Sequence, residues 1–243
     1  MKILISNDDG IRAPGIAALV KAFAGAGYEV LVCAPDGQRS AFSHSLTIGR
    51  RITATETALE GAARAYAISG TPADCVKLGL TVLCPDAQAV ISGVNHGLNV
   101  GTDVLYSGTV AAAMEGAICG RPAMAVSQMA QREGFERTAA LAVQVFETMR
   151  AHPLAPLRVL NLNCPACDEI RGIVTARLEQ LHYTESYVPE APGSMTYVLS
   201  GEVNHSRRQS EDYERLTQGY ATVTILEADM TDCAATDAWN ALI

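Results

Sequence analysis

Short apolar runs alternate along the chain with stretches in which apolar residues recur at helical spacing. Residues 2–6 and 28–34 are two such runs, and their length and β-branched content favour buried strands. Residues 14–26 lie between them and begin with Pro14, which suits a first helical turn. One face of this predicted helix carries Ile16, Leu19, Val20 and Phe23. The pattern predicts a β-α-β unit in a parallel sheet covered by helices on both faces.

The same alternation continues toward the middle of the chain. Further buried strands are predicted at residues 88–92, 123–127 and 159–163, and helices at residues 72–83, 109–119 and 133–150. The last of these helices has an apolar stripe formed by Phe135, Ala139, Ala142, Val143, Phe146 and Met149. Such a stripe is typical of a helix face that packs against a sheet, so we assign it to the core.

The pattern changes after the strand at residues 159–163. Residues 171–205 alternate weakly, lack a helical stripe and contain turn formers at Pro189 and Pro192, which favours a β-rich extension that leaves the sheet. A short helix at residues 210–218 and a strand at 220–226 follow.

These elements together predict one α/β domain spanning residues 1–243. Its fold class is a Rossmann-like three-layer sandwich with a mainly parallel sheet and a β-rich C-terminal extension. The predicted core comprises about residues 1–165 and 220–228, the extension or exchanged hairpin about 170–206, and the C-terminal tail 229–243.

The amino-acid composition and net charge limit which partners and which cellular location fit this chain. The chain has 49% hydrophobic and 18% charged residues, typical of a well-buried globular protein, and a net charge of -8. That charge would repel a nucleic-acid polymer, whereas a small phosphorylated substrate can bind beside a cation that reverses the local field. The first apolar run is too short for a signal peptide, and no stretch approaches the roughly 18 apolar residues of a membrane span. We therefore expect a cytoplasmic protein without a membrane partner.

The cysteines support the same expectation. There are seven, an odd number, mostly within apolar segments, which suits reduced thiols. Cys164 and Cys167 form a Cys-x-x-Cys pair that could be a redox pair or half of a zinc site. No second such pair exists, and the preceding residues predict the end of a strand. We favour a strand terminus with incidental thiols.

The loop after the first strand carries the adjacent carboxylates Asp8 and Asp9, followed by Gly10. Two neighbouring carboxylates repel each other when they are gathered into a cleft, and a divalent cation compensates them directly. Oxygen ligands favour a hard ion such as Mg2+ or Mn2+. The alternative is a simple turn that caps the following helix.

Two further loops have complementary chemistry. Residues 34–47 follow the second strand and combine several serines with Arg39 and His44, although an ordinary turn would also explain them. Residues 92–101 follow a buried strand and are rich in glycine and asparagine, which permit close backbone approach and offer neutral oxygens. The next helix begins near Thr109, and a free helix N-terminus suits phosphate. Ligands of open α/β sheets bind where such loops converge.

Five segments of the chain resemble successive signature blocks of the SurE family of nucleotidases. They read ISNDDGIRAPGI, APDGQRSAFSHSLT, SGTPADCVKLGL, ISGVNHGLNVGTDVLYSGTVAAAMEG and LTQGYATVTIL. The similarity is strong over residues 1–128 and weaker at 158–165 and 212–226, and block order and spacing are kept. It implies a divalent-metal-dependent phosphatase acting on nucleoside 5′-monophosphates and often 3′-monophosphates, with some members also hydrolysing short polyphosphate.

The resemblance also implies roles for individual residues. One divalent metal ion per subunit, Mg2+ or Mn2+, would be held by Asp8, Asp9, Ser40 and Asn95, with Asp8 and Asp9 as the catalytic pair. The residues that match the blocks lining the family's phosphate pocket are Asn7, Ser43, Gly93, Asn99, Ser107, Gly108 and Thr109. His44 could protonate the leaving alkoxide or serve only as a loop hydrogen-bonding group. Family members are cytoplasmic dimers or tetramers that exchange a C-terminal segment, so a homodimer or homotetramer is expected.

The chain departs from the family pattern in the extension. A basic Gly-Arg-Arg stretch of the family is Leu178-Glu179-Gln180 here, and the usual Asp-Pro-Arg-Gly-Arg-Pro segment is replaced at residues 189–194. These differences leave nucleotide preference and assembly open. A competing hypothesis is a regulatory module that binds a nucleotide without hydrolysing it.

Overall fold

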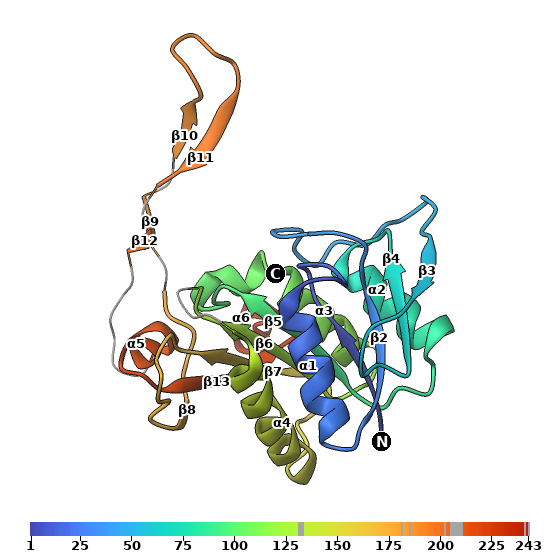
Figure 1. The fold of residues 1–243 in the computed structure, drawn as a ribbon. Helices are drawn as coiled ribbons and strands as arrows, with labels where there is room; N and C mark the ends of the chain where they lie inside the picture. The colour runs from blue at the N-terminus through green and yellow to red at the C-terminus, as the bar shows by residue number, and fades with distance from the viewer. Residues whose placement is uncertain are drawn as a thin grey trace.

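The computed structural model describes residues 1–130, 134–180, 182–184, 186–201, 203–204, 211–240 and 242. A nine-stranded sheet forms its centre, in the order β3-β4-β2-β1-β5-β6-β7-β13-β8 (Figure 1). Six neighbouring strands are parallel: β4 (Arg64–Ile68), β2 (Glu29–Pro35), β1 (Lys2–Ser6), β5 (Val90–His96), β6 (Ala123–Gln128) and β7 (Arg158–Cys164). Residues in the central strands are almost all buried, as expected for a sheet covered on both faces.

The edges of the sheet contain antiparallel pairs. Strand β3 (Ala54–Thr57) runs antiparallel to β4 at one edge. At the other edge β13 (Ala221–Glu227) runs antiparallel to β7, and β8 (Ile173–Thr175) is parallel to β13. The mainly parallel sheet predicted from the apolar runs is therefore confirmed.

Helices cover the sheet on two sides. One side is covered by α1 (Pro14–Gly25) and α4 (Glu136–Ala151), whose apolar residues share a core cluster with β1, β2 and β5. The other side is covered by α2 (Pro72–Leu78), the π-helical turn η1 (Gly79–Leu83) and α3 (Gly108–Ile118). This arrangement confirms the three-layer sandwich.

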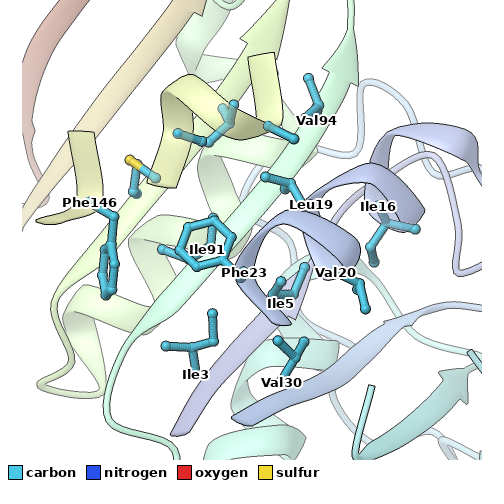
Figure 2. Packing of buried hydrophobic residues seen from close by; sticks show 14 of the residues in the cluster. Ile3, Ile5, Ile16, Leu19, Val20, Phe23, Val30, Ile91, Val94 and Phe146 are labelled. Atoms are coloured by element: carbon cyan, nitrogen blue, oxygen red, sulfur yellow. The ribbon is translucent and has the colours of Figure 1, made fainter. Parts of the chain in front are cut away.

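The packing between α1, α4 and the sheet is dominated by large apolar side chains. Figure 2 shows Phe23 of α1 and Phe146 of α4 lying over the strand residues Ile3 and Ile91, all of which are fully buried. The rings of Phe23 and Phe146 form an edge-to-face pair with centroids 5.6 Å apart, and Tyr28 makes the same contact with both. Each such buried side chain stabilises the fold by roughly 1.5–3 kcal/mol. The predicted stripe of α4 is thus part of the core.

Several predicted boundaries differ from the observed ones. Strands β3 and β4 were not predicted, because β3 is a polar, mostly exposed edge strand and β4 is only partly buried and contains two alanines, a residue type depleted in strands. The helix predicted at 72–83 changes to a π-helical turn after Leu78. Helix α4 begins at Glu136, and the predicted start at residue 133 lies outside the described residues. Likewise α5 (Asp212–Thr217) is shorter than predicted, and residue 210 is not described.

The C-terminal part contains an extension and a final helix. Strands β10 (Ser186–Pro189) and β11 (Tyr197–Ser200) form a hairpin that projects away from the body (Figure 1), joined to it by β9 (His182–Tyr183) and β12 (Val203–Asn204). The β-rich extension is therefore confirmed, and the divergent residues 189–194 begin at the end of β10 and include the hairpin turn. Helix α6 (Cys233–Asn240) was not predicted.

The order of the strands locates a ligand site. After β1 the chain adds β2 and β4 on one side, then returns to β5 on the other side of β1. The loops after β1 and β5 consequently diverge at the carboxyl ends of adjacent strands. Crevices at such switch points are where open α/β sheets bind ligands.

Candidate metal and phosphate site

Three loops meet at the carboxyl ends of β1, β2 and β5. The backbone N-H of Arg39 donates to the carbonyl of Asp8 at 2.7 Å, which joins the second loop to the first. The backbone N-H of His96, at the end of β5, donates to the carboxylate of Asp9. The backbone N-H of Ser43 donates to the carbonyl of Tyr106 at 3.1 Å. The structure thus brings together the loops that carry the predicted site residues.

The first loop is shaped by a turn between Asn7 and Gly10. The buried side chain of Asn7 donates to the Gly10 carbonyl at 2.9 Å and accepts from its N-H at 3.2 Å. Gly10 has a φ of 101°, and a Cβ there would lie 3.1 Å from the Gly37 carbonyl carbon. Only glycine fits this left-handed position and close contact. The turn projects Asp8 and Asp9 from the end of β1, and both the amide nitrogen and the amide oxygen of Asn7 take part in it.

Asp8 is a buried carboxylate, only 4% exposed. Both the hydroxyl and the backbone N-H of Thr109 donate to it. Burial and, to a lesser extent, the charge of Asp9 raise the pKa of Asp8 to about 6, against a lowering effect of the Thr109 hydrogen bonds. Burial also raises the pKa of Asp9. No lysine or arginine in the described ranges forms an ion pair with either carboxylate. The backbone hydrogen bond and the charge of His96 oppose the effect of burial on the pKa of Asp9.

The raised pKa of Asp8 predicts a pH-dependent stability of the metal-free protein. Between the ordinary value of 3.8 and about 6, the folded state keeps a proton that the unfolded state has released. The free energy of unfolding should therefore fall as the pH rises through this window, by up to about 3 kcal/mol from Asp8. Chelator-treated wild type and Asp8→Asn would be compared by urea denaturation at both ends of the window. Equal pH slopes in the two proteins would contradict this prediction.

Ser40 and Asn95 supply neutral oxygens to the same region. The Asn95 amide nitrogen donates to the Gly97 carbonyl at 3.0 Å, which leaves its side-chain oxygen available. Ser40 is exposed, and its hydroxyl accepts from Gln38 at 3.1 Å. Within the described residues, no three His, Cys, Asp or Glu side chains are grouped to hold a metal. An ion here would depend on two carboxylates and neutral oxygens, a donor set that fits a hard divalent cation.

The first turn of α3 lies directly against Asp8. A Cβ on Gly108 would lie 2.8 Å from the Asp8 Cβ and 3.0 Å from both Asp8 Oδ2 and Pro72 Cγ. The Ser107 hydroxyl caps the helix by accepting from the Val110 N-H at 3.1 Å. The partial positive charge of a helix N-terminus favours anions, so this turn can contribute to binding a phosphate beside the carboxylates.

Other residues from the phosphate blocks have different surroundings. The side chain of Asn99 is buried and donates to the Ser127 hydroxyl at 2.7 Å, while the backbone carbonyl of Asn99 accepts from the side chains of Asn161 and Asn163. Gly93 is buried, and a Cβ there would lie 2.2 Å from the Val126 carbonyl oxygen. These positions shape the loop from inside the protein. Ser43 is held by the carbonyls of Leu105 and Tyr106.

The histidine of the second loop has partners that the sequence analysis did not identify. His44 Nε2 lies 2.9 Å from Glu115 Oε2, and Lys77 Nζ donates to Glu115 Oε1 at 2.6 Å. Glu115 is 2% exposed, and its pKa is lowered by both partners against an opposing effect of burial. The sequence does contain one signal for this cluster: Glu115 is the single acidic residue of an otherwise apolar helix. Such a charge is seldom buried without partners, so a partner for it could have been expected.

The Cys-x-x-Cys pair occupies a strand end, as the sequence analysis favoured. Cys164 is the last residue of β7 and is buried, whereas Cys167 follows it and is partly exposed; neither forms a disulfide.

Among the described helices, none combines the length and apolar character needed to cross a membrane.

Comparisons with known proteins place the chain in a family. The model of the family "Survival protein SurE" matches residues 3–185. The chain is 41% identical over 244 residues to a 5′-nucleotidase SurE of Clostridium beijerinckii, covering 96% of each protein. It is 42% identical over 240 residues to a 5′-nucleotidase SurE of Aeromonas hydrophila, covering 95% of this chain and 94% of the relative.

A solved structure supports the same assignment. The crystal structure of the SurE protein from Aquifex aeolicus matches with a TM-score of 0.86 and 33% identity, over 100% of this chain and 99% of that one. The similarity therefore includes the extension and the edge strands as well as the blocks that carry Asp8 and Asp9. With a family model matching most of its length and relatives about 40% identical from end to end, the chain belongs to the SurE family.

Proposed function

We propose that this protein is a divalent-metal-dependent phosphatase that hydrolyses nucleoside 5′-monophosphates to nucleoside and phosphate, with 3′-monophosphates and short polyphosphate as further substrates. The relatives named above are 5′-nucleotidases of nearly equal length, and the chain is accordingly a phosphoric monoester hydrolase. The observation that carries the finer proposal is the pair of adjacent carboxylates, Asp8 and Asp9, beside the N-terminus of α3. In the described part of the chain, neither forms an ion pair with a lysine or arginine.

The residues that would hold the ion are Asp8, Asp9, Ser40 and Asn95. They offer two carboxylates, a hydroxyl and an amide oxygen, the ligand chemistry of Mg2+ or Mn2+. When bound, such an ion supplies Lewis acidity toward a phosphate oxygen and lowers the pKa of a water ligand. Thr109 orients Asp8 and favours its ionised form, against the effect of burial, by donating two hydrogen bonds to it.

The chain's own groups would bind and orient the phosphate. The first turn of α3 presents the backbone of Gly108 next to Asp8, and the Ser107 hydroxyl lies at the same helix end. Donors fixed in place before the reaction stabilise negative charge on the phosphoryl oxygens as the bond to the leaving group breaks. Because the backbone at Gly108 is positioned by packing, little reorganisation is needed when the substrate arrives.

Removal of the metal tests this function. Purified protein incubated with adenosine 5′-monophosphate and Mn2+ or Mg2+ should release phosphate, and release should stop with EDTA and resume when the ion is restored. A colorimetric phosphate assay measures each step. A protein that binds the nucleotide in the presence of either ion but releases no phosphate would instead support the regulatory-module hypothesis.

We also propose that the hairpin of β10 and β11 joins copies of this chain into a homodimer or homotetramer. The apolar side chains of Tyr187 and Leu199 face each other across the two strands and are 69% and 51% exposed. Exposed apolar groups on a projecting arm favour association, because burying them against another chain removes them from water.

A double substitution in the hairpin tests the assembly. Tyr187→Ser with Leu199→Ser should lower the oligomer mass measured by light scattering after size-exclusion chromatography, while the melting temperature of the body changes little. Val82→Ser is the control, since Val82 is 63% exposed on the body. An unchanged mass for the double variant, with dimers or tetramers in the wild type, would refute a role of this surface.

A further inference from the structure

A cavity of about 630 Å³ lies along α3 next to the candidate phosphate site. One wall is a face of the helix formed by Ser107, Val110, Ala111 and Met114, residues three or four apart. The lining also includes Ile225 and Leu226 of β13 with neighbouring residues. The lining is mostly apolar, and its volume lies within the range of small-molecule sites.

Ser107 belongs to both the cavity lining and the candidate phosphate site. This residue caps α3 and lines the cavity, and the next residue, Gly108, packs against Asp8. A phosphate bound at the first turn of α3 would therefore leave the rest of its ester beside the apolar helix face. Flat, weakly polar rings bury well against such a face.

His44 is a polar group of this cavity whose position is fixed by a hydrogen bond. Its Nε2 is occupied by Glu115, whose second oxygen is occupied by Lys77, so the buried carboxylate is satisfied on both sides. In the described part of the chain no partner is found for His44 Nδ1. That nitrogen remains free to form a hydrogen bond with a molecule in the cavity.

The position of Glu115 argues against a role of His44 in the phosphoryl chemistry. Glu115 follows Gly108 by seven residues, which is about 10 Å along an α-helix. His44 therefore contacts α3 two turns away from the carboxylates. This distance suits the far end of a nucleoside monophosphate better than the bond that breaks at its phosphate.

We propose that this cavity receives the nucleoside part of the substrate, and that His44 is a specificity-determining residue that recognises it. Glu115 and Lys77 are positioning residues that hold the imidazole through Nε2. This inference rests on the proposed function, which concerns the phosphate, and adds the substrate subsite. The hydrogen bond from a fixed His44 would favour nucleotides over phosphate esters that lack a base.

The test compares two substrates. For His44→Ala, kcat/KM for adenosine 5′-monophosphate should fall about tenfold, mainly through a higher KM, because the lost contacts bind ground and transition states alike. For glycerol phosphate, which has no base, kcat/KM should stay within about twofold. Adenosine should also inhibit glycerol phosphate hydrolysis about tenfold more weakly in this variant. Ile48→Ala, a change at an 86% exposed site near His44 in the sequence, should leave all three quantities unchanged.

Glu115→Gln tests the positioning role. Glutamine lacks the negative charge that lets Glu115 accept strong hydrogen bonds from both His44 and Lys77. We therefore expect kcat/KM for adenosine 5′-monophosphate to fall by less than in His44→Ala, and kcat/KM for glycerol phosphate to stay unchanged. Equal loss for both substrates in His44→Ala would overturn the proposal, because His44 would then act on the phosphate or on loop geometry. No change for either would also overturn it, as would be expected if a second copy of the chain filled the cavity.

Direct binding separates this inference from the proposed function. Adenosine titrated into the wild type and His44→Ala by calorimetry gives the same comparison without turnover. A wild type that hydrolyses neither ester would contradict the proposed function, while weaker adenosine binding by His44→Ala would still support the subsite. Equal adenosine binding by both proteins would refute it.

Discussion

Replacing Asp9 with asparagine is expected to lower phosphate release by about a thousandfold or more without unfolding the protein. The change removes one of the two charges that would hold the ion and keeps the shape of the side chain. Asp9 is only partly buried, and its burial raises its pKa, so the charge is not what stabilises the fold. Loss of its repulsion should also let the pKa of Asp8 fall, since Asp9 is one cause of that elevation.

Asp168→Asn provides a matched control for Asp9→Asn. Asp168 is exposed in the segment after β7, and the substitution there is chemically identical. The measurements are the turnover of adenosine 5′-monophosphate over a range of Mn2+ concentrations and the melting temperature. Asp9→Asn with wild-type turnover would exclude Asp9 from the metal site, whereas activity restored by a large excess of Mn2+ would indicate weakened ion binding.

Gly108→Ala is expected to reduce turnover by about ten- to a hundredfold and to destabilise the fold by about 1–3 kcal/mol. The added methyl would lie 2.8 Å from the Asp8 Cβ and 3.0 Å from Pro72 Cγ. Neither neighbour can move freely, because Thr109 holds Asp8 and Pro72 begins α2. Helix α3 must shift away from the carboxylates, which displaces the groups proposed to bind phosphate.

Gly25→Ala is the matched control for this steric effect. Nothing lies within 4 Å of a Cβ at Gly25, which is the last residue of α1. Alanine is the better helix former, so this variant should be as stable as the wild type or up to about 1 kcal/mol more stable. Urea denaturation and steady-state kinetics measure both variants. Wild-type kinetics for Gly108→Ala would show that the contact between α3 and Asp8 is not needed for activity.

Much of the fold was predictable because its elements are strongly patterned. Buried parallel strands such as β1 and β2 are short continuous apolar runs, and α4 carries a complete apolar stripe. Strands β3 and β4 were missed because their pairing with neighbouring strands, and not a strong apolar pattern of their own, makes them strands. The prediction of Asp8, Asp9, Ser40 and Asn95 as metal ligands rests on motifs and stays a prediction until an ion is observed.

The sequence by itself determined the fold class, the family and the loops that carry the chemistry, because apolar periodicity and block order are local properties of the chain. Only the tertiary structure decided how those loops combine. In the fold, Thr109 donates hydrogen bonds to Asp8, and the backbone of His96 donates one to Asp9. Glu115 forms hydrogen bonds with both His44 and Lys77. The partners in these contacts are separated by 38 to 101 residues in the sequence, and their burial and pKa shifts arise only when the sheet and helices pack together.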